Sequence, residues 1–362
     1  MKTSDRLEHW LRELVSRGAA DLFLVAGFAP AIRLNGVVTP MAEPPLEGEG
    51  IEAAMLPLLH PQALDRYRND GSADVSLRRI GLGRFRLNLH RERGHAAATI
   101  RALPAQPPLL AELGLPPQVE QLTRLHHGLV LVGGATGSGK TTTVAALVNE
   151  INRRDARHII TIEDPIEYEH AHQQSVVEQV EVGIDAPDFP TALRAALRQA
   201  PDVIVIGEMR DPETMKIALT AGETGHLVFS TLHTTDVTST VARVADSFPP
   251  ERQPTIRQDL SMALGAVLTQ TLIPTGGGRV PAAELLMVGY GARQHIRKNA
   301  LQHLHQEITI TKRSGSITLE ESLAQLVHKG LISADDARTR TGHAEELEGL
   351  LRASPIVDRR ST

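Results

Sequence analysis

The chain has 362 residues, of which 41% are hydrophobic, 22% charged and 3% aromatic, and this predicts a globular protein of two or three domains. The absence of cysteine excludes disulfides, a cysteine nucleophile and cysteine-ligated metal centres. The net charge of −5 and the scarcity of aromatic residues argue against a protein that binds nucleic acid.

The first hundred residues predict a small α+β domain. Asn35-Gly36 lies between two short apolar runs and is a strong signal for a two-residue β-hairpin turn. We place this domain at residues 1–102 and a proline-marked linker at 103–115. The expected elements, in chain order, are a helix at 4–17, strands at 21–25, 31–34 and 37–39, a helical stretch at 50–69, and strands at 73–79, 84–90 and 96–102.

A different pattern begins near residue 127. Continuous apolar runs at 129–132, 158–162, 203–206 and 227–230 are typical of strands that are buried on both faces of a mostly parallel sheet. Helical segments at 140–153, 190–199 and 213–222 alternate with them. This alternation predicts a doubly wound α/β domain. We assign it to residues 116–290, followed by a helical region at 291–345 and a polar tail at 346–362.

The chain shows no sign of export or membrane insertion. Residues 1–6 are polar and do not resemble the start of a signal peptide. The longest uncharged stretch, 260–278, is interrupted by Gln270, Pro274 and several Thr and Gly residues, so it does not suit a membrane span. We therefore expect a cytoplasmic protein without an integral membrane segment.

The sharpest motif follows the first apolar run and matches the phosphate-binding loop G-x-x-x-x-G-K-[ST]. Its glycines allow backbone N–H groups to turn toward phosphate oxygens at the start of a helix. Lys140 supplies a charge for the β- and γ-phosphates, and the Thr141 hydroxyl can bind Mg²⁺. The expected nucleotide-binding residues are Gly134, Ala135, Thr136, Gly137, Ser138, Gly139, Lys140, Thr141 and Thr142.

Carboxylates follow two other expected strands. Glu208 follows the run at 203–206 after Gly207, and Glu163 and Asp164 follow the run at 158–162. Phosphoryl transfer to water needs a group that orients the attacking water, usually at the end of a neighbouring strand. We therefore expect Glu208 and Glu163 to be catalytic, and both of them to bind Mg²⁺ with Asp164 and Thr141. Gly207 occupies the position where such a motif usually has Asp.

Two histidines, His226 and His233, lie on either side of the run at 227–230. The chain has 16 histidines, so most of them have no special role. A histidine at a strand end beside a phosphate loop can contact the γ-phosphate. We therefore include both as candidate catalytic residues.

These four blocks, in this order, resemble the secretion-ATPase superfamily and specifically its type IV pilus retraction, or twitching motility, ATPases. Gly134–Thr142 is similar to the Walker A motif, 162–168 to the Asp box, 206–211 to an atypical Walker B motif with Gly207, and 225–235 to the His box. The segment 20–24 resembles the start of the family's PAS-like N-terminal domain. The resemblance covers residues from about 5 to 340.

The resemblance implies a PAS-like domain followed by a RecA-like ATPase core, with ATP and Mg²⁺ as cofactors. It also implies a hexamer, located in the cytoplasm at the inner-membrane base of the pilus machine, where an inner-membrane platform protein is its partner. The N-terminal domain of the family contributes arginines that stabilise charge on the γ-phosphate. Arg86 and Arg101 lie at the matching places of this sequence.

Several alternatives remain open. The retraction family has a helical A-I-R-N-L-I-R-E motif, of which Gly291–Lys298 keeps only the two arginines and Ile296, so an accessory paralogue of the retraction motor is one alternative. Pilus-extension and type II secretion ATPases usually add a larger N-terminal region and a Cys₄ zinc module, which this cysteine-free chain lacks. A nucleic-acid motor would need basic stripes or stacking aromatics, and a small-molecule kinase would not explain the N-terminal domain.

Overall fold

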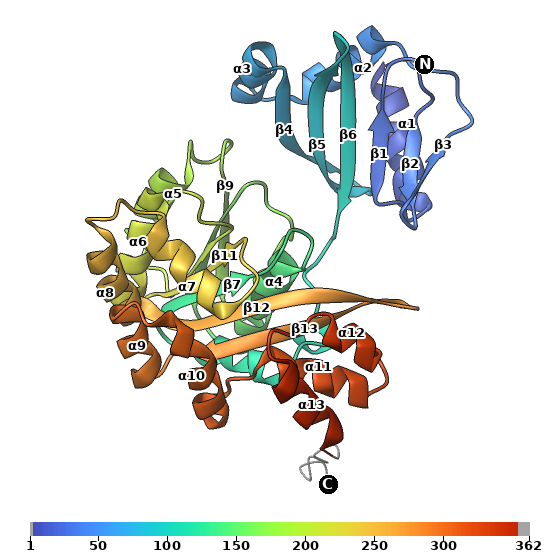
Figure 1. Cartoon of the computed structure of the whole chain (residues 1–362). Coiled ribbons are helices and arrows are strands. Elements are labelled where there is room, and N and C mark those ends of the chain that lie inside the picture. The colour runs from blue at the N-terminus through green and yellow to red at the C-terminus, as the bar shows by residue number, and fades with distance from the viewer. Residues whose placement is uncertain (1–2, 354–362) are drawn as a thin grey trace. The chain divides into compact units, whose positions relative to one another are not determined.

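The computed structural model describes residues 3–353 and divides the chain into two units (Figure 1). The first unit contains Met1–Gln106 together with two short segments from further along the chain, Asp164–Glu169 and Val180–Asp188. The second unit contains Pro107–Glu163, His170–Gln179 and Phe189 onward.

A six-stranded antiparallel sheet with the order β3-β2-β1-β6-β5-β4 forms the centre of the first unit. The predicted hairpin is confirmed, because Asn35 and Gly36 have φ angles of 48° and 84°, as a primed two-residue turn requires. The elements of this unit are α1 (Thr3–Ser16), β1 (Asp21–Leu24), β2 (Ala31–Leu34), β3 (Val37–Pro40), α2 (Gly48–Met55), η1 (Leu56–Leu58), α3 (Pro61–Asp70), β4 (Ser72–Arg79), β5 (Gly83–Glu92) and β6 (His95–Leu103).

The helical stretch expected at 50–69 is two helices. A 3₁₀ turn that contains Pro57 follows α2, and Pro61 begins α3 after an extended residue, His60. Proline cannot donate the backbone hydrogen bond of a helix interior but fits the first helical turn, so the two prolines separate the helices.

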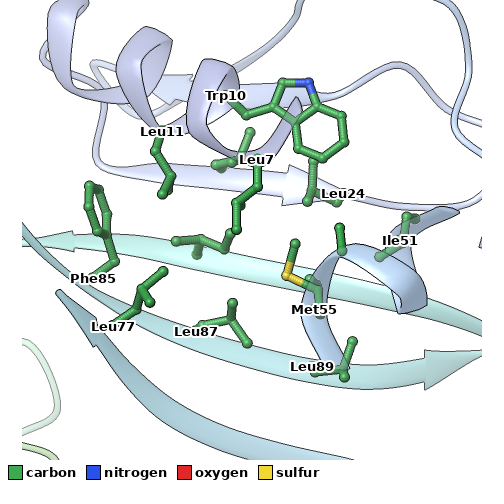
Figure 2. Close-up of a cluster of buried hydrophobic side chains, with 14 of the residues drawn as sticks. Leu7, Trp10, Leu11, Leu24, Ile51, Met55, Leu77, Phe85, Leu87 and Leu89 are labelled. Atoms are coloured by element: carbon green, nitrogen blue, oxygen red, sulfur yellow. The ribbon is translucent and has the colours of Figure 1, made fainter. Parts of the chain in front are cut away.

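Alternate side chains of β5 form part of the hydrophobic core of the first unit. Phe85, Leu87 and Leu89 are fully buried, and Figure 2 shows them facing Leu11 and Met55 from the helices. The alternate positions of a strand point to the opposite face of the sheet. Arg84 and Arg86 therefore lie on the face of the sheet that does not contribute to this core.

The second unit contains a seven-stranded sheet with the order β13-β12-β7-β11-β10-β8-β9. The pairs β12–β7, β7–β11, β11–β10 and β10–β8 are parallel, and β12–β13 is antiparallel. The fold class predicted from the sequence is confirmed. The strands are β7 (Gly128–Gly133), β8 (His158–Glu163), β9 (Val176–Glu181), β10 (Val203–Ile206), β11 (Leu227–Leu232), β12 (Leu264–Thr275) and β13 (Gly278–Met287).

The helices of this unit include the three predicted crossovers, α4, α5 and α6. The helices are η2 (Leu110–Leu113), η3 (Pro117–Arg124), α4 (Lys140–Arg154), α5 (Phe189–Ala196), α6 (Pro212–Glu223), α7 (Val237–Asp246), α8 (Gln253–Ala263), α9 (Tyr290–Arg297), η4 (Leu301–His303), α10 (Leu304–Ile310), η5 (Thr311–Ser314), α11 (Leu319–His328), α12 (Ala334–Arg338) and α13 (Ala344–Arg352).

The second unit also differs from the sequence prediction. The uncharged stretch 260–278 contains β12, which was not predicted because an apolar run without clear period does not distinguish a strand from a buried helix. The tail expected to be polar from residue 346 is helical over Ala344–Arg352, because Leu347 anchors it in an apolar cluster with α11. Residues 354–362 of that expected tail lie outside the described part of the chain.

Candidate phosphate-binding site

The parallel register brings the predicted motifs to one edge of the sheet. Leu232 of β11 pairs with Gly133 of β7, and Ile206 of β10 pairs with Ile162 of β8. The residues that follow these strands therefore emerge at the same carboxyl edge, where ligands bind in open α/β sheets. They are the phosphate loop, Glu208, Glu163 and His233.

The phosphate loop has a backbone that only glycine can adopt. Gly134, Gly137 and Gly139 have φ angles of 154°, 79° and 88°. A Cβ atom at Gly134 would lie 2.2 Å from Ser138 Oγ and 2.7 Å from the carbonyl oxygen of Gln270. The loop therefore packs against β12 without space for a side chain at its first position.

Lys140 begins α4 and turns back over the loop. Its Nζ donates hydrogen bonds to the carbonyl oxygens of Gly134 at 2.8 Å and Ala135 at 3.0 Å. Burial lowers the pKa of the Lys140 ammonium, and the negative charge of Glu208 offsets part of that effect. The ammonium is thus only partly satisfied by neutral carbonyl groups, and phosphate oxygens would be stronger partners for it.

Gln270, in the middle of β12, holds the loop and is a residue that sequence reasoning missed. Its side chain is 5% exposed, accepts a hydrogen bond from Thr143 Oγ1 at 2.8 Å and donates one to the carbonyl oxygen of Ser138 at 2.6 Å. The available signal was a lone amide in an apolar run, because a buried polar side chain needs partners. From the sequence alone, Gln270 is recognisable only as an interruption of the uncharged stretch 260–278.

Replacing Gln270 with Leu should weaken nucleotide binding about tenfold and lower stability by about 1–3 kcal/mol, because two buried hydrogen-bonding groups lose their partner. Titration with a fluorescent nucleotide and thermal unfolding measure the two effects. Gln302→Leu changes an exposed glutamine in the same unit and should alter neither. Lower stability with unchanged nucleotide affinity would show that Gln270 does not position the loop.

Glu208 lies at the centre of the edge, in a setting suited to act on water beside the loop. Its side chain is 16% exposed, and its Oε2 lies 3.8 Å from Nε2 of His233, while Arg210 forms an ion pair with Oε1. The preceding Gly207 donates its N–H to Ile162 O at 2.8 Å, and a Cβ there would come within 3.3 Å of the same oxygen. This close approach of β8 and β10 leaves little room for a side chain at Gly207, where such motifs usually have Asp.

The second carboxylate, Glu163, is held at the end of β8. Its Oε1 accepts hydrogen bonds from Thr161 Oγ1 at 2.7 Å and from Gln179 Nε2 at 3.2 Å. Asp164 begins a segment that belongs to the first unit. Of the four expected magnesium ligands, three lie at the same edge of the sheet. Glu163 ends β8, Glu208 follows β10, and Thr141 lies in the first turn of α4.

His226 does not lie at this edge, contrary to expectation. It precedes β11, whose first residue, Leu227, pairs with Gly128 at the start of β7. The six residues of β11 span about 20 Å, so they separate His226 from the phosphate-loop end. Its Nδ1 lies 3.2 Å from the carbonyl oxygen of Ala221, at the end of α6. Of these two histidines, therefore, His233 is the one that lies near Glu208.

Arg86 and Arg101 lie in the first unit, opposite each other in the register of β5 and β6. Directly opposed residues of neighbouring strands project from the same face of a sheet. Arg86 Nε lies 3.4 Å from Asp74 Oδ1, and Arg101 Nε lies 2.8 Å from Oδ1 of the buried Asp21. The two guanidinium groups share one half-exposed, charged face of the unit.

Comparison with known proteins assigns the family. The model of the family described as "Type II/IV secretion system protein" matches residues 84–345, which include every block described above. The chain belongs to this family. None of the helices between residues 3 and 353 is both long and apolar enough to cross a bilayer.

Individual relatives match along nearly the whole chain. The type IV pilus retraction ATPase PilT of Pseudomonas aeruginosa is 42% identical over 325 residues, 90% of this chain and 94% of that protein. The type IV pilus ATPase PilU of the same organism is 37% identical over 353 residues, 97% of this chain and 92% of that protein. A crystal structure of the pilus retraction motor PilT with bound ADP has a TM-score of 0.85 at 42% identity, covering 94% of this chain and 98% of that one.

The segment 291–298, which departs from the retraction motif, forms most of α9. A Cβ at Gly291 would lie 2.4 Å from the Glu307 carboxylate oxygens, so the absence of a side chain at Gly291 leaves room for Glu307. The Glu307 carboxylate also pairs with His295 at 3.4 Å. Arg293 is kept from the motif and donates from Nη1 to the carbonyl oxygens of Ser261 at 2.6 Å and Met262 at 2.7 Å. These contacts stabilise the end of α8 and give Arg293 a structural role.

Proposed function

We propose that the protein is a motor ATPase that couples ATP hydrolysis to type IV pilus retraction. The observation that carries the proposal is that the phosphate loop, Glu208 and His233 lie at one edge of the sheet. The chain that carries this site is 42% identical to a pilus retraction ATPase over 90% of its length. ATP phosphates would bind the loop N–H groups and Lys140. Mg²⁺ would be held by Thr141 and by the carboxylates Glu163, Asp164 and Glu208 through oxygen atoms, which this ion prefers.

Within this site Glu208 is the proposed group that orients and deprotonates the attacking water. It is held by Arg210 and lies within a few ångströms of His233, so His233 can sense the γ-phosphate while Glu208 faces the water. Glu163 already accepts two hydrogen bonds, which suits a positioning role for metal-bound water better than proton transfer.

The proposed working form is a hexamer at the cytoplasmic face of the inner membrane, where a platform protein of the pilus machine receives the motion. Arg86 and Arg101 are the proposed charges that stabilise the γ-phosphate in the transition state. To do so they would leave Asp74 and Asp21, whose carboxylates now hold them. Such an exchange suits arginines that act only during turnover.

Substituting Arg86 or Arg101 with Ala should leave ATP affinity within a few-fold and lower kcat about 10²-fold, since both arginines act on the transition state. Steady-state hydrolysis and nucleotide titration separate the two parameters. Arg93→Ala removes an arginine whose side chain is 88% exposed in a turn of the same unit and serves as the control. Unchanged kcat, with lower stability for Arg101→Ala, would assign Arg101 to packing with Asp21 and not to catalysis.

The experiment that tests the function is deletion of the gene, scored for pilus number and surface motility. A retraction motor predicts excess pili and no twitching, restored by the wild-type gene and not by the Lys140→Ala variant. Cells without pili would contradict the proposal and indicate an extension motor.

An accessory role is the second candidate. The altered α9 segment and the 37% identity to PilU over 97% of the chain favour it. In that case the deletion strain would still retract its pili and would lose only part of its motility.

A further inference from the structure

Outside the phosphate-binding site, three metal-ligating side chains converge among the C-terminal helices. They are His305 of α10, Glu320 of α11 and Glu346 of α13, each with a ligand atom within 4.8 Å of the others. His305 Nε2 lies 2.8 Å from Glu346 Oε2. Figure 1 shows α11, α12 and α13 next to one another in this region. The ligands therefore come from three helices that are separate in the sequence.

Each carboxylate is oriented by hydrogen bonds to its Oε1 atom. Glu320 Oε1 accepts from Thr341 Oγ1 at 2.7 Å and from the His343 N–H at 3.3 Å. Glu346 Oε1 accepts from Thr318 Oγ1 at 3.0 Å. Such outer contacts hold ligands in place at metal centres, and they leave both Oε2 atoms directed to the cluster.

Glu320 makes the strongest case for a missing ligand. Its side chain is 1% exposed, and its Oε2 is buried without a hydrogen-bond partner. A buried carboxylate oxygen that lacks a partner is costly, so native proteins provide one by a proton, a water molecule or a cation. A carboxylate oxygen of Glu346 and a ring nitrogen of His305 lie within 4.8 Å of the Glu320 carboxylate, and both groups are metal ligands.

We propose that His305, Glu320 and Glu346 bind a divalent first-row transition metal ion such as Zn²⁺. Ligand bonds of about 2.0–2.2 Å put neighbouring ligand atoms about 3.3 Å apart, so the wider contacts of the cluster, which reach up to 4.8 Å, would shorten and the 2.8 Å contact between His305 and Glu346 would lengthen slightly. The imidazole favours zinc-like ions over Mg²⁺ or Ca²⁺, which prefer oxygen ligands only. Three protein ligands leave one position for water, and the partly exposed His305 and Glu346 give the ion a path of entry.

The consequence of binding is structural. α13 has one fully buried side chain, Leu347, with Leu350 and Leu351 partly buried beside it, so its apolar contact is confined to one cluster with α11. A metal bond through Glu346 would fasten this helix to α10 and α11. The site uses none of the residues of the phosphate loop, so the inference stands apart from the proposed motor function.

The test uses full-length, tag-free and nucleotide-free protein, stripped with a chelator and titrated with Zn²⁺ against a chromophoric chelator. We expect one Zn²⁺ per chain, a Tm rise on the order of 5 °C at 100-fold excess over Kd, and slower hydrogen exchange in residues 344–352. Anomalous diffraction at the zinc edge should place the ion between the three side chains.

Glu320→Gln and His305→Asn should each weaken Zn²⁺ binding at least tenfold, about the loss seen when metal-site partners are removed. His305 is on the surface side of the cluster, so its variant answers the question if Glu320→Gln does not fold. Glu345→Gln makes the same chemical change at an exposed neighbour of Glu346 and is the matched control. The proposal is overturned if wild-type protein binds no Zn²⁺, or if both cluster variants bind it as tightly as the control.

Discussion

Lys140→Ala is expected to weaken ATP binding by about 100-fold and to abolish measurable turnover. The ammonium is the one side-chain cation at the start of α4, and charge-assisted hydrogen bonds to phosphate oxygens contribute about 1.5–3 kcal/mol each. The wild-type ammonium already contacts Gly134 O and Ala135 O, so it needs little movement to meet a phosphate. Nucleotide titration and phosphate release measure the two effects.

The matched control is Lys216→Ala. Lys216 lies on α6 with its side chain 51% exposed and pairs with Asp259, away from the loop in sequence. The Lys216→Ala variant should keep both ATP binding and ATP turnover. Unchanged turnover in the Lys140 variant would falsify the assignment of the phosphate loop.

Glu208→Gln should separate binding from chemistry. The amide keeps the size of the side chain and its capacity to hydrogen-bond, but it cannot take a proton from water. We therefore expect ATP affinity within a few-fold of wild type and a kcat lower by about 10²–10⁴-fold. Single-turnover hydrolysis with Mg²⁺ measures the chemical step directly.

Two further variants are needed to assign this loss of kcat to Glu208. Glu213→Gln changes an exposed carboxylate that pairs with Arg194 and should behave as wild type. Glu163→Gln should have a smaller effect than Glu208→Gln, since Glu163 is held by Thr161 and Gln179. The opposite order would exchange the roles of the two carboxylates.

The altered α9 segment bears on the choice between a retraction motor and its accessory paralogue. Gly291, His295 and Glu307 form one local arrangement, in which the missing Cβ makes room for a carboxylate that pairs with the histidine. Arg293 is tied to the end of α8. The departing segment thus makes its own set of contacts with α8 and α10, and deletion phenotypes decide its effect on the pilus.

The sequence by itself determined the local features of this protein. Asn35-Gly36 predicted its hairpin, the four apolar runs predicted parallel strands, and Gly134–Thr142 predicted a phosphate loop between β7 and α4. Each of these features depends on the conformational preferences of adjacent residues or on a hydrophobic period of a few residues, so each can be recognised before the fold is known.

Only the tertiary structure decided which distant residues meet. Gln270 binds Thr143 across 127 positions, and His305, Glu320 and Glu346 converge from three helices. His226 and His233 look equivalent in sequence, yet the parallel register puts them at opposite ends of β11. A side chain's partners depend on how whole elements pack, and burial then makes each unpaired polar group costly, so these sites emerge only when the strands and helices are assembled.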